Sequence, residues 1–359
     1  APSRVGDKIG QLIGVSPGQV MVSDTTSINL FKLTMAALTY QPDKKRIITD
    51  TLNFPSDLYV LQGCVNLLSP SQGDGQGEDL QYKIIRIPSL DNDITPDLAS
   101  LESAIDEDTA LVTLSHVVFK SGFIYDMQRI TDLAHAKGAL VLWDLSHSVG
   151  SVPITLDECN ADLAIGCTYK YLNGGPGSPA FLYVNKNIQE KLSSPIWGWW
   201  GQSKPFDFGL DYEAAPGVQR FLAGTQPMIS LLAMEASLDS ILAAGMDAIR
   251  KKSILMTDYA SFLTDAWLAP LGFSLGSPRD SAINGSHISN RHTDGYRIDR
   301  ALIEEMNVIP DFRAPDNIRL GFAPLYTSFT EIRQGFERIK RVMDEKRYEK
   351  YPKQKLTVT

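Results

Sequence analysis

The feature that most constrains the fold is a regular alternation of short apolar segments with segments of helical spacing. Apolar runs typical of buried strands occur at residues 46–49, 82–87, 110–116, 139–143, 161–166 and 180–184. Segments with helical spacing lie between several of them, at residues 27–38, 57–68, 96–105 and 127–137. Strands that alternate with helices form a mostly parallel sheet covered on both faces, so we predict an α/β fold, a three-layer αβα sandwich.

The length of the chain indicates more than one domain. It has 359 residues, whereas single cores stop growing at roughly 250–300 residues. A long apolar helix is expected at residues 227–243, and the elements after it are more mixed and more charged. We therefore predict a large domain over residues 1–230 and a smaller α+β C-terminal domain over residues 231–359. The polar, glycine-rich segment Ser69–Glu78 is expected to be a surface loop.

Charge and composition exclude several classes of function. Lys and Arg number 34 against 42 Asp and Glu, a net charge of −8, which argues against nucleic acid or an anionic membrane as the main partner. No apolar run approaches the ~20 residues of a membrane span. The odd count of three cysteines, without C-x-x-C spacing, favours a reducing compartment, and we expect a cytoplasmic protein. The five histidines show no H-x-x-x-H spacing, so no metal site is predicted.

Three segments have residue types suited to chemistry. Asp24-Thr25-Thr26-Ser27 leads directly into a helix, where free N–H groups and hydroxyls can bind an anion such as a phosphate; plain N-capping is the alternative. Asp144 follows the apolar run at 139–143, at the strand end where ligands bind in such sheets, and it too could be an N-cap.

The third segment is Thr168-Tyr169-Lys170, which follows another apolar strand. Partial burial lowers the pKa of a lysine and exposes its amine as a nucleophile, although a lysine at a strand end is usually just solvated. Taken together, the three segments match pyridoxal phosphate. This cofactor needs a phosphate cup, an acid opposite its pyridinium nitrogen and a lysine for its aldehyde.

Longer motifs carry a family resemblance. They are DTTSINLF (24–31), NFPSD (53–57), WDLSHSVG (143–150), GCTYKYLNGGPGS (166–178), GWWGQ (198–202), GTQP (224–227) and RLGFAPLYTSFTE (319–331). From about residue 8 to about 345 the chain resembles the kynureninases, pyridoxal-phosphate enzymes of aminotransferase-like fold type I. The resemblance implies hydrolytic Cβ–Cγ cleavage of L-kynurenine or 3-hydroxykynurenine, which gives anthranilate or 3-hydroxyanthranilate and L-alanine in tryptophan degradation and NAD biosynthesis.

The resemblance also implies roles for individual residues. The catalytic ones are Lys170, which would bond to the cofactor aldehyde, Asp144, which would pair with the ring nitrogen, and Tyr169, which would hold the phosphate and shuttle a proton. Further cofactor contacts are implied for Thr26, Ser27, Phe54, Asp57, Ser115, His147, Trp199 and Thr225. Substrate contacts are implied for Arg319, which would clamp the α-carboxylate bidentately, and for His147 and Trp199. Thr225 would reach the phosphate of a neighbouring subunit, which implies a homodimer.

The resemblance further implies an N-terminal segment ahead of the present first residue, contributing to the small domain. One alternative is an enzyme similar to cysteine desulfurases or selenocysteine lyases, which would need a catalytic cysteine in a C-terminal loop. No cysteine follows Cys167, which disfavours this alternative. Another is a non-catalytic pyridoxal-phosphate-binding module. Such proteins usually carry a nucleic-acid-binding domain, and the acidic charge argues against one.

Overall fold

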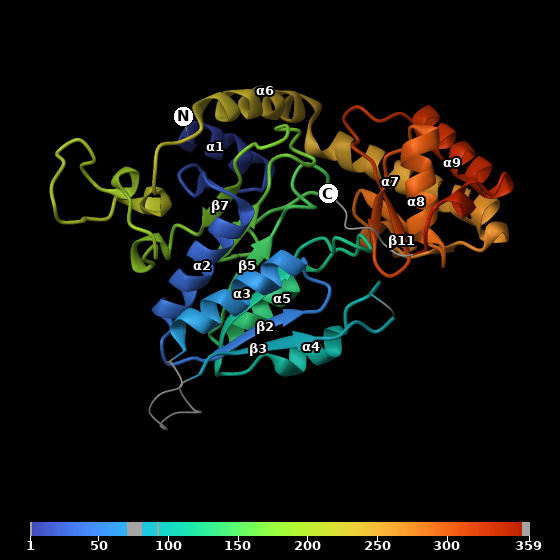
Figure 1. Ribbon diagram of the computed structural model, residues 1–359. Helices are drawn as coiled ribbons and strands as arrows, with labels where there is room; N and C mark the ends of the chain where they lie inside the picture. Colours follow the sequence, from blue (N-terminus) through green and yellow to red (C-terminus); the bar gives the residue numbers. More distant parts are fainter. Residues whose placement is uncertain (1, 70–80, 92, 354–359) are drawn as a thin grey trace.

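The computed structural model describes residues 2–69, 81–91 and 93–353 (Figure 1). Apart from Ser69, the predicted surface loop at Ser69–Glu78 lies outside these residues. The chain forms a large domain, built on a seven-stranded sheet, and a smaller C-terminal domain, which lies to the right in Figure 1.

The sheet of the large domain is mostly parallel. Its strands are β1 (Val20–Val22), β2 (Arg46–Asp50), β3 (Lys83–Ile87), β4 (Thr109–Ser115), β5 (Leu140–Asp144), β6 (Leu163–Gly166) and β7 (Phe181–Val184). They lie in the order β1-β7-β6-β5-β4-β2-β3. Only β7 runs antiparallel to its two neighbours, β1 and β6. The predicted α/β class is confirmed.

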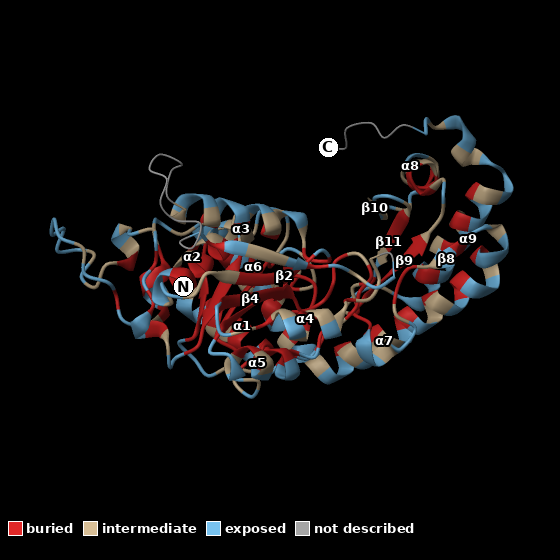
Figure 2. Ribbon diagram, turned by 90° about the horizontal axis from the view of Figure 1, so that it is seen from below, coloured by how far each residue is buried: buried red, intermediate tan, exposed pale blue. Residues whose placement is uncertain are grey.

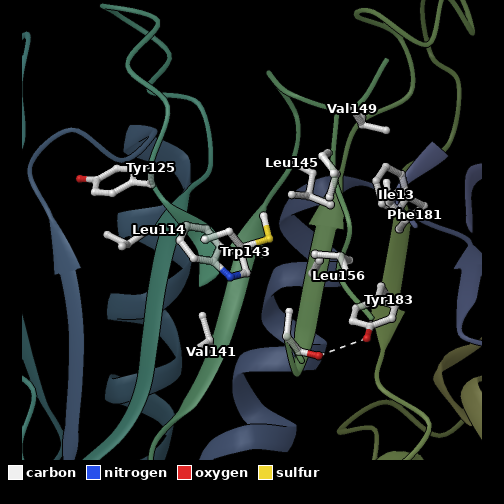
Figure 3. Close-up of a cluster of buried hydrophobic side chains, with 14 of the residues drawn as sticks. Ile13, Leu114, Tyr125, Val141, Trp143, Leu145, Val149, Leu156, Phe181 and Tyr183 are labelled. Atoms are coloured by element: carbon white, nitrogen blue, oxygen red, sulfur yellow. Dashed lines mark hydrogen bonds between the residues drawn. The ribbon is translucent and has the colours of Figure 1, made fainter. Parts of the chain in front are cut away.

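Helices cover both faces of this sheet. They are α1 (Pro2–Leu12), α2 (Thr26–Tyr40), α3 (Pro55–Leu68), α4 (Leu98–Ala104), α5 (Met127–Ala136) and α6 (Met228–Ala244). Alternate residues of β5 point to opposite faces. Val141 and Trp143 therefore join one core with α1, α4, α5 and α6, whereas Leu140 and Leu142 join a second core with α2 and α3. Figure 3 shows the first of these cores, around Trp143. The two cores make the three layers of the predicted αβα sandwich.

The small domain pairs an antiparallel sheet with three helices. Its elements are α7 (Met246–Leu263), β8 (Ser274–Leu275), β9 (His287–Arg291), α8 (Gly295–Met306), β10 (Asp311–Arg313), β11 (Asn317–Gly321) and α9 (Phe329–Asp344). The strand order is β10-β11-β9-β8. Apolar residues of the helices pack on this sheet in a core of their own, and their outer sides are exposed (Figure 2). The predicted α+β character is confirmed.

Short helical turns complete the described chain. They are η2 (Gln189–Lys191), η3 (Trp199–Gly201), η4 (Gly217–Phe221), η5 (Thr264–Leu268), η6 (Ala269–Leu271), η7 (Ser281–Ile283) and η8 (Arg347–Lys350). Among the described residues, no single helix has the length and apolar composition to cross a membrane. The bent pair 228–244 and 246–271, with an angle of 84° between its parts, passes that test by length and composition only.

Helix α6 connects the two domains. It runs along the large domain and leads into α7 (Figure 1). Its buried residues Leu231 and Met234 belong to the core around Trp143. Arg4 of α1 pairs with Glu235 of α6 at 2.6 Å. The predicted division after residue 230 stays a prediction, although the buried side of α6, as far as Ile241, packs in the core of the large domain.

Candidate active site

The functional side chains gather where the parallel strands end. Asp144 is the last residue of β5 and lies opposite Ser115, the last residue of β4. Lys170 follows β6, the neighbouring strand on the other side. Parallel strands present their carboxyl ends at one edge of a sheet, so these residues meet there. A cavity of about 440 Å³ opens at this edge, and both Asp144 and Lys170 line it.

One end of this cavity is suited to a phosphate. Thr26 and Ser27 begin α2, and the preceding Thr25 caps the helix by accepting a hydrogen bond from the N–H of Ile28. The hydroxyls of Ser27 and Ser56 lie 3.0 Å apart, and both residues line the cavity. Free N–H groups at a helix start, with hydroxyls beside them, form an anion site. Thr25 therefore caps the helix, and the predicted binding of an anion by Thr26 and Ser27 is compatible with this cap.

A buried lysine stabilises the end of the cavity that is suited to a phosphate. The ammonium group of Lys32, which is fully buried in α2, lies 2.5 Å from the carboxylate of Asp24. It also donates to the carbonyl of Phe221 at 2.7 Å. Asp24 has a φ of 51°, a conformation that L-residues rarely adopt. The ion pair therefore holds the turn that leads into Thr25 and Thr26.

A pair of carboxyl groups lies deeper in the cavity. Burial, together with the charge and hydrogen bond of Asp144, raises the pKa of Asp57 well above its usual value. This rise favours the neutral form of Asp57, which can donate its hydrogen to Asp144. The carboxylate of Asp144 also accepts a hydrogen bond from the N–H of Ser146 at 2.8 Å. A buried carboxylate held in this way is suited to face a protonated ring nitrogen.

Two aromatic rings lie near the amine of Lys170. The amine of Lys170 lies 6.0 Å from the ring centre of Phe54 and 5.5 Å from that of Tyr169. Phe54 precedes the first turn of α3 and packs edge-on against Phe119 at 5.2 Å. Burial raises the pKa of Tyr169 to about 12, so its hydroxyl stays protonated. The predicted nucleophile therefore lies beside a flat apolar face and a hydroxyl donor.

A second cavity, of about 520 Å³, adjoins the first. The two share Phe54, His147, Tyr169 and Lys170, and the second also includes residues of the small domain: His287, Asp311, Arg313, Arg319, Gly321, Ala323, Tyr326 and Thr327. Burial and the charges of Lys170 and Arg319 lower the pKa of His147 well below its usual value. Burial likewise lowers the pKa of His287 to about 3. Both imidazoles are neutral at pH 7.

Arg319 links the two domains at this cavity. Its Nη1 donates to the carbonyl of Phe119 at 2.6 Å and lies 3.3 Å from Nε2 of His147. Its Nε and Nη2 both donate to Oδ2 of Asp311, at 3.2 and 2.5 Å. The predicted carboxylate clamp is thus in the cavity, and a carboxylate of the protein occupies its Nε–Nη2 edge.

Among the residues predicted to contact the cofactor, three lie differently from the others: Ser115, Trp199 and Thr225. Ser115 is buried, donates to Asn53 at 2.6 Å and lines neither cavity. Trp199 also lines neither cavity; it is 42 % exposed and packs on Trp200 at 4.4 Å. Thr225 lines the first cavity of its own subunit. Contacts with a neighbouring subunit are not tested by a single chain, so the predicted roles of Trp199 and Thr225 stay predictions.

Four residues of the cavities were not predicted from the sequence: Ser56, His287, Asp311 and Arg313. Asp311 and Arg313 lie on a three-residue strand that no periodicity indicates, and their place depends on the fold of the small domain. His287 ends up in the cavity for the same reason. Ser56 had a signal, since it lies inside the quoted motif NFPSD.

These residues fit pyridoxal phosphate. The first cavity joins an anion site, a buried carboxylate and a lysine amine within one space lined by Phe54. In addition, His147 has a buried Nδ1 without a partner among the described residues, so a polar ligand atom can still bind there. This combination defines a fold type I pyridoxal-phosphate enzyme.

Comparisons with known proteins support this class of enzyme and identify the family within it. The aminotransferase class-V family model matches residues 7–265, and the model of the kynureninase C-terminal domain matches residues 249–339. The kynureninases of Pseudomonas fluorescens and Burkholderia pseudomallei (strain K96243) are 42% and 41% identical over 347 residues, which cover 96% of this chain and 79% of each relative. The chain belongs to the kynureninase family, whose members are pyridoxal-phosphate-dependent hydrolases acting on carbon–carbon bonds.

Solved structures agree on the fold. A cysteine desulfurase from Thermococcus onnurineus NA1 matches with a TM-score of 0.81 and 18% identity, covering 96% of this chain and 84% of that one. Alanine–glyoxylate aminotransferase from Nostoc sp. matches with a TM-score of 0.69 and 16% identity, covering 95% and 86%. At these identities the likeness shows the aminotransferase-like fold alone.

Proposed function

We propose that this protein hydrolyses the Cβ–Cγ bond of L-kynurenine, 3-hydroxykynurenine or both, releasing L-alanine and the corresponding anthranilate. The observation that carries the proposal is the merging of the two cavities at Phe54, His147, Tyr169 and Lys170. One cavity suits the cofactor, and the other presents Arg319 to a carboxylate. An α-amino acid can therefore reach the lysine with its carboxylate held on the small domain.

The residues of the site have separate roles in the proposed reaction. When bound, pyridoxal phosphate supplies a protonated ring that accepts electrons from the substrate's α-carbon. Asp144 keeps the ring nitrogen protonated, and the first turn of α2 with Ser27 holds the phosphate. Lys170 removes and returns the proton at the α-carbon, since its amine lines both cavities and can act as a base.

Tyr169 is the proposed proton shuttle for the water that adds to the side-chain carbonyl. Its high pKa keeps the hydroxyl protonated, so that it can donate to the carbonyl oxygen or to the phosphate. The hydroxyl group of the water becomes part of the carboxyl group of the released anthranilate. Its one remaining proton goes to the β-carbon as the Cβ–Cγ bond breaks, and this carbon becomes the methyl group of alanine. Phe54 gives the cofactor an apolar face and keeps bulk water from it.

The direct test is an assay of the cofactor-loaded protein with kynurenine, 3-hydroxykynurenine and cysteine. We expect fluorescent anthranilate or 3-hydroxyanthranilate and no sulfide. Lys170→Ala should abolish turnover together with the visible absorbance of the bound cofactor. Full activity of that variant, or sulfide release from cysteine, would refute the proposal.

The structure gives no support to the desulfurase alternative. Cys167 lines the first cavity, but its polar groups are bound to Ser146. Its N–H donates to the Ser146 hydroxyl at 3.1 Å, and its thiol donates to the Ser146 carbonyl at 3.8 Å. Burial raises the pKa of this thiol, which makes it a poor nucleophile. No cysteine follows it in the sequence.

We further propose that the protein works as a homodimer with shared active sites. An arm at residues 197–212 extends from the left of the large domain in Figure 1. It exposes apolar side chains, namely Trp197, Trp199, Phe206, Phe208 and Leu210, of which Phe208 is 77 % exposed. Contiguous exposed apolar side chains of this kind are typical of protein interfaces. A second copy that covers the arm would bring Trp199 towards a neighbouring cavity.

Mixing two inactive variants tests whether sites are shared. If Thr225 serves the neighbouring cavity, a heterodimer of Lys170→Ala with Thr225→Ala has one intact site and regains activity. If Thr225 serves its own cavity, each site keeps one defect and activity stays low. Sedimentation of the double variant Phe208→Asp/Leu210→Asp should show a monomer, whereas Tyr59→Asp, an exposed site on α3, should not change the oligomeric state.

We propose a cytoplasmic location and a role in tryptophan degradation or NAD biosynthesis. The three cysteines support the location, because Cys64, Cys159 and Cys167 are free thiols and two of them are buried. Fractionation of the source cells followed by the anthranilate assay tests it. The role in metabolism follows from the proposed substrate.

A further inference from the structure

We propose that Asp311 is a resident carboxylate, which occupies the substrate-binding edge of Arg319 and moves to Arg313 when the carboxylate of an amino acid arrives. The inference rests on the proposed function, because it takes the amino-acid substrate as the incoming anion. It assigns two positioning residues, Asp311 and Arg313, beside the predicted clamp.

The backbone of the small domain brings the three side chains together. Strands β10 and β11 are antiparallel, and Asp311 lies directly opposite Arg319 in their register. Asp311 and Arg313 are two residues apart on β10, so their side chains leave the same face of the sheet. All three residues line the second cavity. The arrangement is therefore built into the hairpin and does not depend on a flexible loop.

The hydrogen bonds of Arg319 leave no edge open for a second carboxylate. A guanidinium group has five N–H donors, and bidentate binding of a carboxylate needs two parallel ones. Asp311 accepts from Nε and Nη2, at 3.2 and 2.5 Å. On the other edge, Nη1 donates to the Phe119 carbonyl at 2.6 Å and faces His147 at 3.3 Å. A bidentate substrate carboxylate must therefore replace Asp311.

Asp311 has a second partner within reach. Its Oδ1 already accepts from Nη2 of Arg313 at 3.1 Å. Arg313 has a buried Nε without a hydrogen-bond partner in the described part of the chain, so it can take more of the carboxylate. Although burial opposes it, the charge of Arg319 lowers the pKa of Asp311, which is therefore ionised. A short rotation of one side chain can transfer it from Arg319 to Arg313.

The exchange has a physical reason. Arg319 is only 9 % exposed, and a buried guanidinium without a partner is costly. Asp311 neutralises it while the cavity holds no substrate. The same contact lowers the affinity for the substrate, because the free energy of displacing Asp311 is subtracted from that of binding.

Two single variants and their combination test the inference in the cofactor-loaded enzyme. The probe is L-alanine, whose equilibrium binding is followed by the visible spectrum of the cofactor, with ethylamine as the matched ligand without a carboxylate. Asp311→Asn should tighten L-alanine binding roughly 10-fold, and Arg313→Gln should weaken it roughly 10-fold, because Asp311 then stays on Arg319. The double variant should bind L-alanine like Asp311→Asn. Ethylamine affinity should not change.

Two results would overturn the inference. Weaker or unchanged L-alanine binding by Asp311→Asn would mean that Asp311 only holds Arg319 in place. A double variant as weak as Arg313→Gln would mean that Arg313 contacts the substrate itself. Thermal unfolding of each variant, with Asp311→Ser as a second replacement, separates these results from misfolding. Because L-alanine binding needs no bond cleavage, a protein that binds it but leaves kynurenine intact would refute the proposed function and not this one.

Discussion

Asp57 and Asp144 lie within hydrogen-bonding reach of each other in the lining of the cofactor cavity, and burial together with the charge of Asp144 raises the pKa of Asp57 well above its usual value. Two ionised carboxylates repel each other at such short range, so a proton on one of them is favoured. A neutral Asp57 beside Asp144 avoids this repulsion at the place where the ring nitrogen is expected.

The first prediction concerns this pair. Asp57→Asn keeps a neutral donor for Asp144, so the affinity for pyridoxal phosphate should stay within about 3-fold of wild type. Asp57→Leu removes the donor and should weaken cofactor binding roughly 10-fold, about 1.4 kcal/mol, because Asp144 loses a buried hydrogen bond. Titration of each variant with pyridoxal phosphate measures this. Equal affinity of the two variants would show that the hydrogen bond contributes nothing.

Arg319→Lys should raise KM for the amino-acid substrate roughly 100-fold, about 2.7 kcal/mol, and change kcat less. A lysine keeps the charge but loses the flat two-donor edge, and it cannot reach the Phe119 carbonyl in the same way. Steady-state kinetics over a wide substrate range measure both constants. A fall in kcat with an unchanged KM would contradict the role of Arg319 as a carboxylate clamp.

Lys32→Met should lower the free energy of unfolding by about 2 kcal/mol, because it leaves Asp24 and the Phe221 carbonyl without their common donor. Cofactor affinity should fall as well, since the turn before α2 loses its anchor. The matched control is Lys340→Met, whose partner Asp344 lies one turn away on an exposed helix face. That exposed pair should contribute less than about 1 kcal/mol. Urea denaturation compares the two variants, and equal losses would refute the assignment.

Asp299 should make stability depend on pH. Burial raises its pKa in the folded protein from 3.8 to about 7. Between those values the unfolded chain releases its proton first, so stability from this group falls as pH rises from about 4 to about 7 and is level above. Asp299→Asn should therefore raise Tm at pH 8 by on the order of 2 °C relative to its effect at pH 4. Calorimetry at both pH values measures these changes in Tm, with Asp43→Asn, at an exposed position, as the control. A rise in Tm of Asp299→Asn that is confined to low pH would contradict the prediction.

The large domain could be predicted well from the sequence because its strands are buried and apolar. The run predicted at 110–116 corresponds to β4 at Thr109–Ser115, and the helix predicted at 127–137 to α5 at Met127–Ala136. Strand β1 was not predicted, since three residues are too few to show a period, and α1 was not predicted either. Motifs near strand ends located the cofactor cavity for the same reason: the parallel sheet gathers those ends.

The substrate side of the site was harder to predict. Arg319 was found through the family motif, but its partner Asp311 depends on the register of two short antiparallel strands. Residues eight positions apart meet there only because the hairpin is paired in that register. Likewise His287 and His147 come from different domains, with ring centres 5.9 Å apart, and only the folded arrangement brings them together.

The two domains share hydrogen bonds directly at the site. Besides the contact of Arg319 with Phe119, the hydroxyl of Tyr171 donates to the Ser286 carbonyl at 3.0 Å, and that of Ser289 donates to the Lys120 carbonyl at 2.6 Å. Each domain has its own core, so a rise in temperature can part them while both stay folded. On heating, catalysis should therefore be lost some degrees below the calorimetric transition, and short exposures in that interval should be reversible on cooling.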